Sequence, residues 1–202
     1  DKRPIYKLAA PELIGSIANV GSAKAFDLEN CLGAEPDLVI LPKKAKDYAK
    51  TLNEMGIAAV VVNPESHEAL VDMIKLIANL TGSEETAGKL ITSYNEVLSK
   101  VESATANLDD SKKPVVYMCN TSTYLATAPK DMYQASLVRS AGGKNAGDIL
   151  EGDSWTDVSY EQILTMNPDI IIIPTNNMAN GQPDFTAADV LADANLAEVT
   201  AV

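Results

Sequence analysis

Arginine is nearly absent from this chain of 202 residues, in which 16 basic side chains face 28 acidic ones and give a formal net charge of −12. The two arginines are Arg3 and Arg139. Proteins that bind nucleic acids need clustered Lys and Arg to neutralise phosphates and release counterions. The composition therefore argues against nucleic acid as a partner.

Long hydrophobic runs are lacking as well. No apolar segment approaches the ~20 residues of a transmembrane helix, and the N-terminus has no charged-then-apolar secretion signal. The sequence starts at Asp1 without an initiator methionine. We therefore expect a processed or excised piece, with any targeting segment or lipid anchor upstream of it.

Metal ligands are scarce, because the chain has one histidine, His67, and two cysteines, Cys31 and Cys119. A protein-built zinc site needs three or four such side chains brought together, so we expect no resident metal and no cofactor. Both cysteines lie in apolar stretches, which favours two separate buried thiols over a disulfide.

The common enzyme signatures are missing too: GxxxxGK[ST], a GxGxxG after a strand, HExxH and GxSxG. The glycine-rich segment 141–147 (AGGKNAG) follows a predicted helix at 134–140 rather than a strand, and we interpret it as a helix C-cap and turn. We predict no catalytic residues and do not expect an enzyme.

Four short, continuous apolar runs are typical of strands in a parallel sheet that is covered on both faces. A helical pattern at 46–55 connects the first two runs, and Gly56 is a natural left-handed stop after it. This strand–helix–strand order predicts the α/β class. A further short strand is considered at 18–20. The four runs are residues 37–41, 58–62, 114–118 and 169–173.

A long amphipathic helix follows a predicted helix at 67–80. Apolar residues recur every three or four positions from Ala87 to Leu108, and we expect Ser83 to cap this helix. About 25 residues give a rod of ~37 Å, enough to span two lobes. The predicted organisation is an incomplete N-terminal α/β lobe at 1–80, a bridging helix at 83–108 and a C-terminal α/β lobe at 112–202.

Residues 27–42 and 159–174 form an internal repeat with a constant offset of 132, which aligns Glu29 with Glu161. Each copy consists of an N-cap residue, a short helix, a Pro-Asp turn and an apolar strand. The predicted fold is α/β, with two Rossmann-like lobes containing parallel sheets and one long α-helix bridging them.

Ligands of open parallel sheets bind beyond the carboxyl ends of the strands. This rule selects the loops at 42–44, 63–67, 120–129 and 174–185. For Tyr124 and Trp155 the alternative is packing within a lobe. For His67, Lys43 and Lys44 the alternative is a position exposed to solvent. The candidate ligand-binding residues are Lys43, Lys44, His67, Asn120, Tyr124, Trp155, Asn176 and Asn177.

Several segments together resemble the solute-binding proteins of ABC importers for ferric siderophores, haem and cobalamin. They cover the chain from about residue 17 onward and read LENCLGAEPDLVIL, LNEMGIAAVVVNPESHEAL, TGSEETAGKL, SLVRSAGGKNAGD followed by SWTDVSYEQ, and SYEQILTMNPDIIII. The resemblance implies two lobes bridged by one helix, a metal chelate bound between the lobes, and a periplasmic or cell-surface location. Family members extend beyond this chain at both ends, so we expect a truncated protein.

The resemblance also implies a role for the glutamates that the repeat aligns. In the family, a glutamate at the start of the equivalent short helix of each lobe meets an arginine pocket on the dimeric permease, and these positions are Glu29 and Glu161 here. Paired carboxylates on a rigid body can steer such docking. The simpler alternative is that each glutamate offsets the dipole of its own helix.

Two other functions stay open on the sequence alone. One is a two-lobed α/β enzyme that holds a metal cluster, and the other is a ligand sensor with no part in transport.

Overall fold

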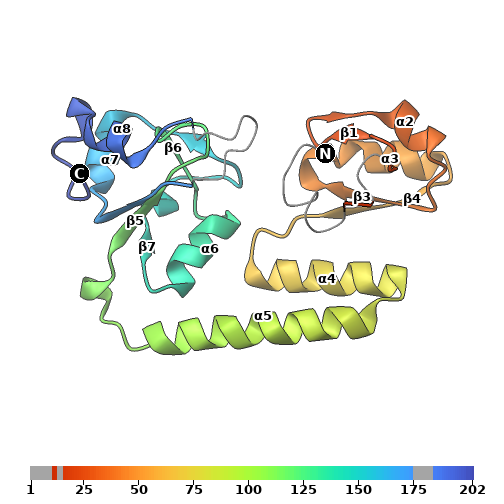
Figure 1. Cartoon of the computed structure of the whole chain (residues 1–202), viewed down its shortest axis with the longest axis horizontal. Helices are drawn as coiled ribbons and strands as arrows, with labels where there is room; N and C mark the ends of the chain where they lie inside the picture. Colours follow the sequence, from red (N-terminus) through yellow and green to blue (C-terminus); the bar gives the residue numbers. More distant parts are fainter. Residues whose placement is uncertain (1–10, 13–15, 175–183) are drawn as a thin grey trace. The chain divides into compact units, whose positions relative to one another are not determined.

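The computed structural model describes residues 11–12, 16–174 and 184–202 (Figure 1). It divides into two compact units, Asp1–Asn63 and Pro64–Val202, called unit 1 and unit 2 below. Both contain parallel strand pairs together with helices, which confirms the α/β class. The division falls directly after the second predicted strand. The finer boundaries, a lobe ending at residue 80 and a bridging helix at 83–108, stay predictions.

Unit 1 contains a short hairpin and a parallel strand pair. In the parallel pair Leu38 lies opposite Ala58, and Gly56 ends the intervening helix with a φ of +82°, as predicted. A strand at 18–20 is wrong, because the hairpin begins only at Gly21, the first residue of β1, which has a positive φ of +85°. The elements are β1 (Gly21–Ser22), β2 (Ala25–Phe26), α2 (Leu28–Gly33), β3 (Leu38–Pro42), the 3-10 helix η1 (Lys43–Ala45), α3 (Asp47–Glu54) and β4 (Ala58–Val62).

The sheet of unit 1 is covered mainly on one face. Its core comprises Cys31, Val39, Leu41, Ala45 and Leu52. On the other face of β3, Ile40 keeps 38% of its surface exposed. The expectation of strands covered on both faces is therefore wrong here, because the described helices pack against a single face.

Two long helices open unit 2. Helix α4 (His67–Thr81) and helix α5 (Glu84–Thr105) lie antiparallel and side by side (Figure 1), joined through Gly82 at a φ of +66°. Helix α5 has 22 residues, slightly fewer than predicted. Ser83 is its N-cap residue, but the predicted side-chain cap is wrong, because no backbone amide of α5 donates to the Ser83 hydroxyl, which lies 3.2 Å from Thr81 Oγ1. No helix within the described ranges is long and apolar enough to cross a membrane.

A three-stranded parallel sheet in the order β7-β5-β9 organises the rest of unit 2, and the short strands β6 and β8 pair antiparallel. In the sheet Val116 lies opposite Ile170 on one side and Asn145 on the other. The elements are the 3-10 helix η2 (Asp110–Lys112), β5 (Val115–Met118), β6 (Ala126–Thr127), α6 (Tyr133–Ser140), β7 (Lys144–Asn145), η3 (Ala146–Ile149), β8 (Thr156–Asp157), α7 (Tyr160–Met166), β9 (Ile170–Ile172), α8 (Ala187–Leu191) and η4 (Ala194–Leu196).

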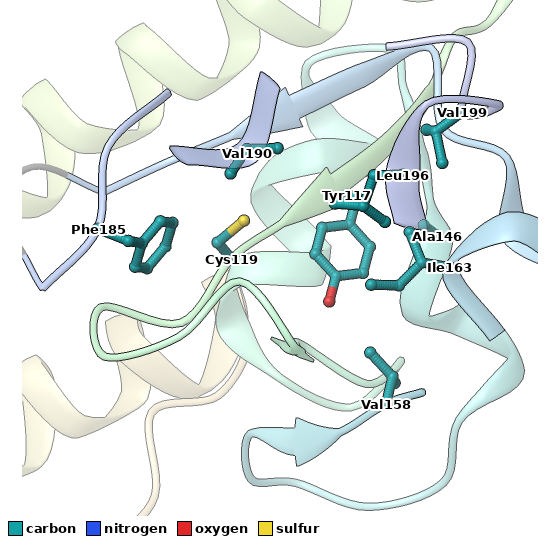
Figure 2. Packing of buried hydrophobic residues seen from close by; sticks show 9 residues of the cluster. All are labelled: Tyr117, Cys119, Ala146, Val158, Ile163, Phe185, Val190, Leu196 and Val199. Atoms are coloured by element: carbon teal, nitrogen blue, oxygen red, sulfur yellow. The ribbon is translucent and has the colours of Figure 1, made fainter. Parts of the chain in front are cut away.

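Figure 2 shows the core of unit 2, in which Tyr117 and Cys119 of the central strand region lie among apolar side chains from α7, α8 and η4. The Tyr117 hydroxyl donates to the carbonyl of Tyr124 at 2.8 Å. Burial raises the pKa of the Cys119 thiol to about 12. Cys31 and Cys119 are both free and buried, which confirms two separate thiols.

The internal repeat is visible as repeated local structure. Asp27 accepts from the amide of Asn30 at the start of α2, and Ser159 forms a full capping box with Gln162 at the start of α7. In both copies the helix, the turn and the strand follow in the predicted order. The offset even aligns Glu35 with Asn167, and these are the non-glycine residues with positive φ, 48° and 37°, among the described residues.

The glycine-rich segment 141–147 ends α6 and leads into β7, which confirms the interpretation as a C-cap and turn. Gly142 has a φ of +84°. Gly147 is required for a different reason, since a Cβ there would lie 2.1 Å from the carbonyl oxygen of Ala128. The side chain of Asn145 donates to the same oxygen at 3.0 Å. The segment thus packs against the loop that follows β5.

Candidate functional site

The three strands of the unit 2 sheet run parallel, so their carboxyl ends meet at one edge. The loop 119–129 follows β5, and η3 follows β7 at this edge. The segment after β9 contains Asn176 and Asn177, which lie outside the described residues.

Asn120 shapes the loop after β5. Its side-chain Oδ1 accepts hydrogen bonds from the backbone amide of Ser122 at 2.9 Å and from Thr121 Oγ1 at 3.4 Å. The backbone amide of Asn120 donates to the carbonyl of Ala126 at 3.0 Å. The loop therefore folds back on itself and places several hydroxyl and amide groups at the strand ends.

Tyr124 lies in the same loop, and its polar end is bound within unit 2. Its hydroxyl donates to Asp193 Oδ2 at 2.8 Å, and the hydroxyl of Tyr160 donates to the same oxygen at 2.9 Å. This contact with the carboxylate, together with burial, raises the pKa of Tyr124. Its ring packs edge-on against Phe185, with centroids 5.4 Å apart. These contacts agree with the packing alternative, and a role in ligand binding stays a prediction.

Trp155 is half-buried and directly precedes β8, whose Thr156 pairs with Thr127 of β6. Because β6 belongs to the loop after β5, this pairing brings Trp155 close to the loop that holds Asn120 and Tyr124. The strand pairing thus connects the segment that follows Trp155 to the loop that holds Asn120 and Tyr124.

His67 is the first residue of α4, after the N-cap Ser66. Its Nε2 lies 3.0 Å from Ser140 Oγ, its Nδ1 shares a hydrogen bond with the Tyr94 hydroxyl, and its ring meets the ring of Tyr133 edge-on. The imidazole therefore connects α4, α5 and α6. A metal centre would have to displace one of these hydroxyl partners, so metal contact by His67 stays a prediction.

Sequence reasoning missed two hydrogen-bonding groups beside these residues. Glu65 Oε2 accepts from the backbone amide of Tyr133 at 3.0 Å, and Asp193 accepts from the two tyrosines described above. The Tyr94 hydroxyl lies 3.2 Å from that of Tyr133, and burial raises the pKa of Tyr94. The hydrogen-bond partners of Glu65, Asp193 and Tyr94 lie tens of residues away along the chain, so no local motif could have revealed these contacts.

The remaining predicted residues lie at helix ends. Lys43 and Lys44 form part of η1, directly after β3 of unit 1, and are exposed. Glu29 and Glu161 are the second residues of α2 and α7, and both are exposed. Hydrogen bonding to Ser159 and to its own backbone amide lowers the pKa of Glu161.

A metal site is not evident in the part of the chain that the structure describes, where no group of three His, Cys, Asp or Glu side chains could hold an ion. Cys31 and Cys119 lie in the separate cores of the two units.

Residues 3–202 match the family described as "Periplasmic binding protein". The cobalamin-binding protein of Halobacterium salinarum is 24% identical over 188 residues, which cover 92% of this chain and 49% of that protein. The petrobactin-binding protein YclQ of Bacillus subtilis is 25% identical over 179 residues, covering 84% of this chain and 53% of that protein. The chain thus spans about half the length of these curated relatives.

Solved structures agree in fold. The molybdate periplasmic binding protein MolA of Haemophilus influenzae superimposes with a TM-score of 0.81 at 20% identity, over 98% of this chain and 64% of that one. A periplasmic solute-binding protein of Veillonella parvula is 30% identical, with a TM-score of 0.68 over 97% of this chain and 58% of that one. With the family match extending over residues 3–202, the chain belongs to the periplasmic binding protein family.

Proposed function

We propose that this chain acts as the extracytoplasmic solute-binding component of an ABC importer and captures an iron–siderophore, haem, cobalamin or related metal chelate. The observation that carries the proposal is the family match over residues 3–202. Relatives named for binding cobalamin and petrobactin support the class of solute. The family is one of binding proteins, which favours capture and release over catalysis, and no observation favours the metal-cluster enzyme.

The carboxyl edge of the unit 2 sheet supports the same function. It carries the amide and hydroxyl groups of the loop after β5, and β8, which directly follows Trp155, pairs with β6 of that loop. Small-molecule sites combine apolar or aromatic surface with a few polar groups that fix the orientation of the ligand. We therefore propose Asn120, Tyr124 and Trp155 as the contribution of unit 2, and Lys43 and Lys44 as that of unit 1.

Docking on the permease is the second part of the proposal. Glu29 and Glu161 occupy the same position in the two copies of the repeat, at the second residue of a short helix, and both carboxylates are exposed. Carboxylates in this arrangement can form charge-assisted hydrogen bonds with arginines of a partner. A lipid anchor upstream of the chain would hold the protein at the membrane.

Trp155 is the single tryptophan of the chain, so its fluorescence reports directly on the proposed site. Titration with cyanocobalamin, haem and a ferric tris-hydroxamate should change its emission with a saturable curve for at least one of them. Isothermal titration calorimetry controls for light absorbed by coloured solutes. No saturable signal and no heat with any of the three would contradict the proposed function.

A further inference from the structure

We infer that His67, Tyr94 and Tyr133 form a binding site for a bare ferric ion where α4, α5 and α6 meet in unit 2. The site uses none of the residues proposed above for the chelate. The inference therefore does not rest on the proposed function, and it adds a second ligand, a free metal ion, to the chain.

Hydrogen bonds already join the donor atoms of these three side chains. Nδ1 of His67 shares a hydrogen bond with the Tyr94 hydroxyl, and that hydroxyl lies 3.2 Å from the hydroxyl of Tyr133. A small metal ion holds nitrogen and oxygen ligands at about 2.0–2.1 Å, so neighbouring ligands of one ion lie roughly 3 Å apart. The two phenol oxygens therefore have the spacing of two ligands of the same ion.

Ser140 prepares the imidazole for metal binding. Its Oγ lies 3.0 Å from Nε2 of His67 and can accept a hydrogen bond from a proton on that nitrogen. In this tautomer Nδ1 carries no proton and offers its lone pair on the side of Tyr94. Histidines that bind metals usually donate from their other ring nitrogen to such a partner, which fixes the orientation of the ring.

The three ligands are held by helices and not by loops. His67 is the first residue of α4, Tyr94 lies within α5, and Tyr133 is the first residue of α6. The carboxylate of Glu65 fixes the start of α6, because it accepts from the Tyr133 amide. Sites built on regular elements keep their geometry more precisely than sites on loops. All three ligand side chains are partly exposed, so an ion can reach them from solvent.

The chemistry of the ligands favours ferric iron. Zinc sites in proteins use Cys, His, Asp and Glu, whereas tyrosine is a known ligand of iron. Two phenolates neutralise two of the three charges of a ferric ion. Glu68 and Glu102 interact electrostatically with Tyr94, and their carboxylates supply further negative charge around it.

Binding replaces protons and keeps the side chains in place. Each phenol releases its proton to water as its oxygen bonds to the iron, the imidazole binds in its neutral form, and the iron stays ferric. The hydrogen bond between Tyr94 and Nδ1 of His67 gives way to two bonds to the same ion. Water fills the remaining positions around the metal.

Addition of ferric nitrilotriacetate to the full chain provides the test. Tyrosinate bound to ferric iron gives a charge-transfer band in visible light, which iron bound to the surface carboxylates does not give. We expect a band that saturates at one iron per chain, and resonance Raman spectra excited in it should show the ring vibrations of tyrosinate. A missing band, or a band without these vibrations, would overturn the inference.

Variants locate the iron. Tyr94→Phe and Tyr133→Phe keep the ring, and each should weaken iron binding by at least about tenfold; Ser140→Ala should weaken it by about tenfold and keep the band. The matched control is Tyr160→Phe, which removes another tyrosine hydroxyl of unit 2, the one that donates to Asp193. Circular dichroism without iron checks that each variant is folded.

Two results with folded variants would overturn the assignment. One is an unchanged band in both Tyr94→Phe and Tyr133→Phe, and the other is loss of the band in Tyr160→Phe. Either result leaves the proposed capture of a chelate intact, because the fluorescence titration of Trp155 measures that function separately.

Discussion

Glu65 accepts a hydrogen bond from the backbone amide of Tyr133 at 3.0 Å, although the two residues are 68 positions apart. Met132, the N-cap residue of α6, forms no side-chain cap, so the carboxylate of Glu65 takes that role from another part of the chain. The bond joins the segment that enters α4 to the first turn of α6.

Removing this cap should destabilise unit 2. Glu65→Ala should lower the free energy of unfolding by about 1 kcal/mol, the usual cost of losing a helix cap, and Glu65→Gln should cost less because the amide oxygen can still accept. Urea denaturation followed by circular dichroism measures both. The control is Glu96→Ala on exposed α5, which should have little effect. An equal loss in Glu65→Ala and Glu96→Ala would contradict the cap.

The imidazole of His67 should contribute through its two hydroxyl partners, Tyr94 and Ser140. His67→Ala leaves both hydroxyls partly buried without this partner, and we expect a loss of about 1–3 kcal/mol. A double-mutant cycle of His67→Ala with Tyr94→Phe isolates the bond, and its coupling free energy should be at least about 0.5 kcal/mol. A coupling free energy of zero would mean that the two side chains stabilise the helices independently.

Asp193 should make the stability of unit 2 sensitive to acid. The backbone amide of Asn195, followed by the hydroxyls of Tyr124 and Tyr160, holds the pKa of Asp193 below its usual value. A carboxyl whose pKa is lower in the folded state stabilises the fold at neutral pH, and this contribution declines as the pH falls below about 4. Asp193→Asn should flatten the dependence of unfolding free energy on pH in that range. An unchanged acid profile would contradict this prediction.

Two glycines should respond in opposite directions to the same substitution. Gly147→Ala should destabilise the chain by about 1–3 kcal/mol, because its Cβ would overlap the carbonyl oxygen of Ala128. Gly88→Ala, at an exposed position in the second turn of α5 with open space around it, should stabilise by about 0.5–1 kcal/mol. Thermal melts of the two variants against the parent compare them. A tolerated Gly147→Ala would mean that η3 can move away from the loop after β5.

Reversal of the charges at Glu29 and Glu161 separates docking from capture. The double variant Glu29→Lys with Glu161→Lys should abolish solute uptake by cells that depend on this protein, while the affinity of the isolated chain for solute stays the same. Glu96→Lys is the matched surface control and should transport normally. Normal uptake by the double variant would leave only the helix-dipole interpretation of these residues.

Local patterns in the sequence predicted most of the regular structure. The apolar runs at 37–41 and 58–62 became β3 and β4 with shifts of at most one residue, and the caps at Asp27 and Ser159 formed as expected. Ser83 failed as a cap because its backbone, with φ −114° and ψ 27°, is not extended, and an N-cap residue normally is.

Part of the candidate site could be predicted from the sequence, and part could not. The rule for parallel strands selected the loop that holds Asn120 and Tyr124, because strand direction follows from chain order. It could not show that the hydroxyl of Tyr124 is already bound to Asp193. That contact spans 69 residues and depends on how the C-terminal segment packs.

The two buried cysteines allow the unfolding of each unit to be followed separately by thiol labelling. Cys31 is 4% exposed in the core of unit 1, and Cys119 is fully buried in that of unit 2. A thiol reagent reaches each sulfur only when the surrounding core opens. The labelling rates of Cys31→Ser and Cys119→Ser therefore measure the opening of each unit separately, without any added probe.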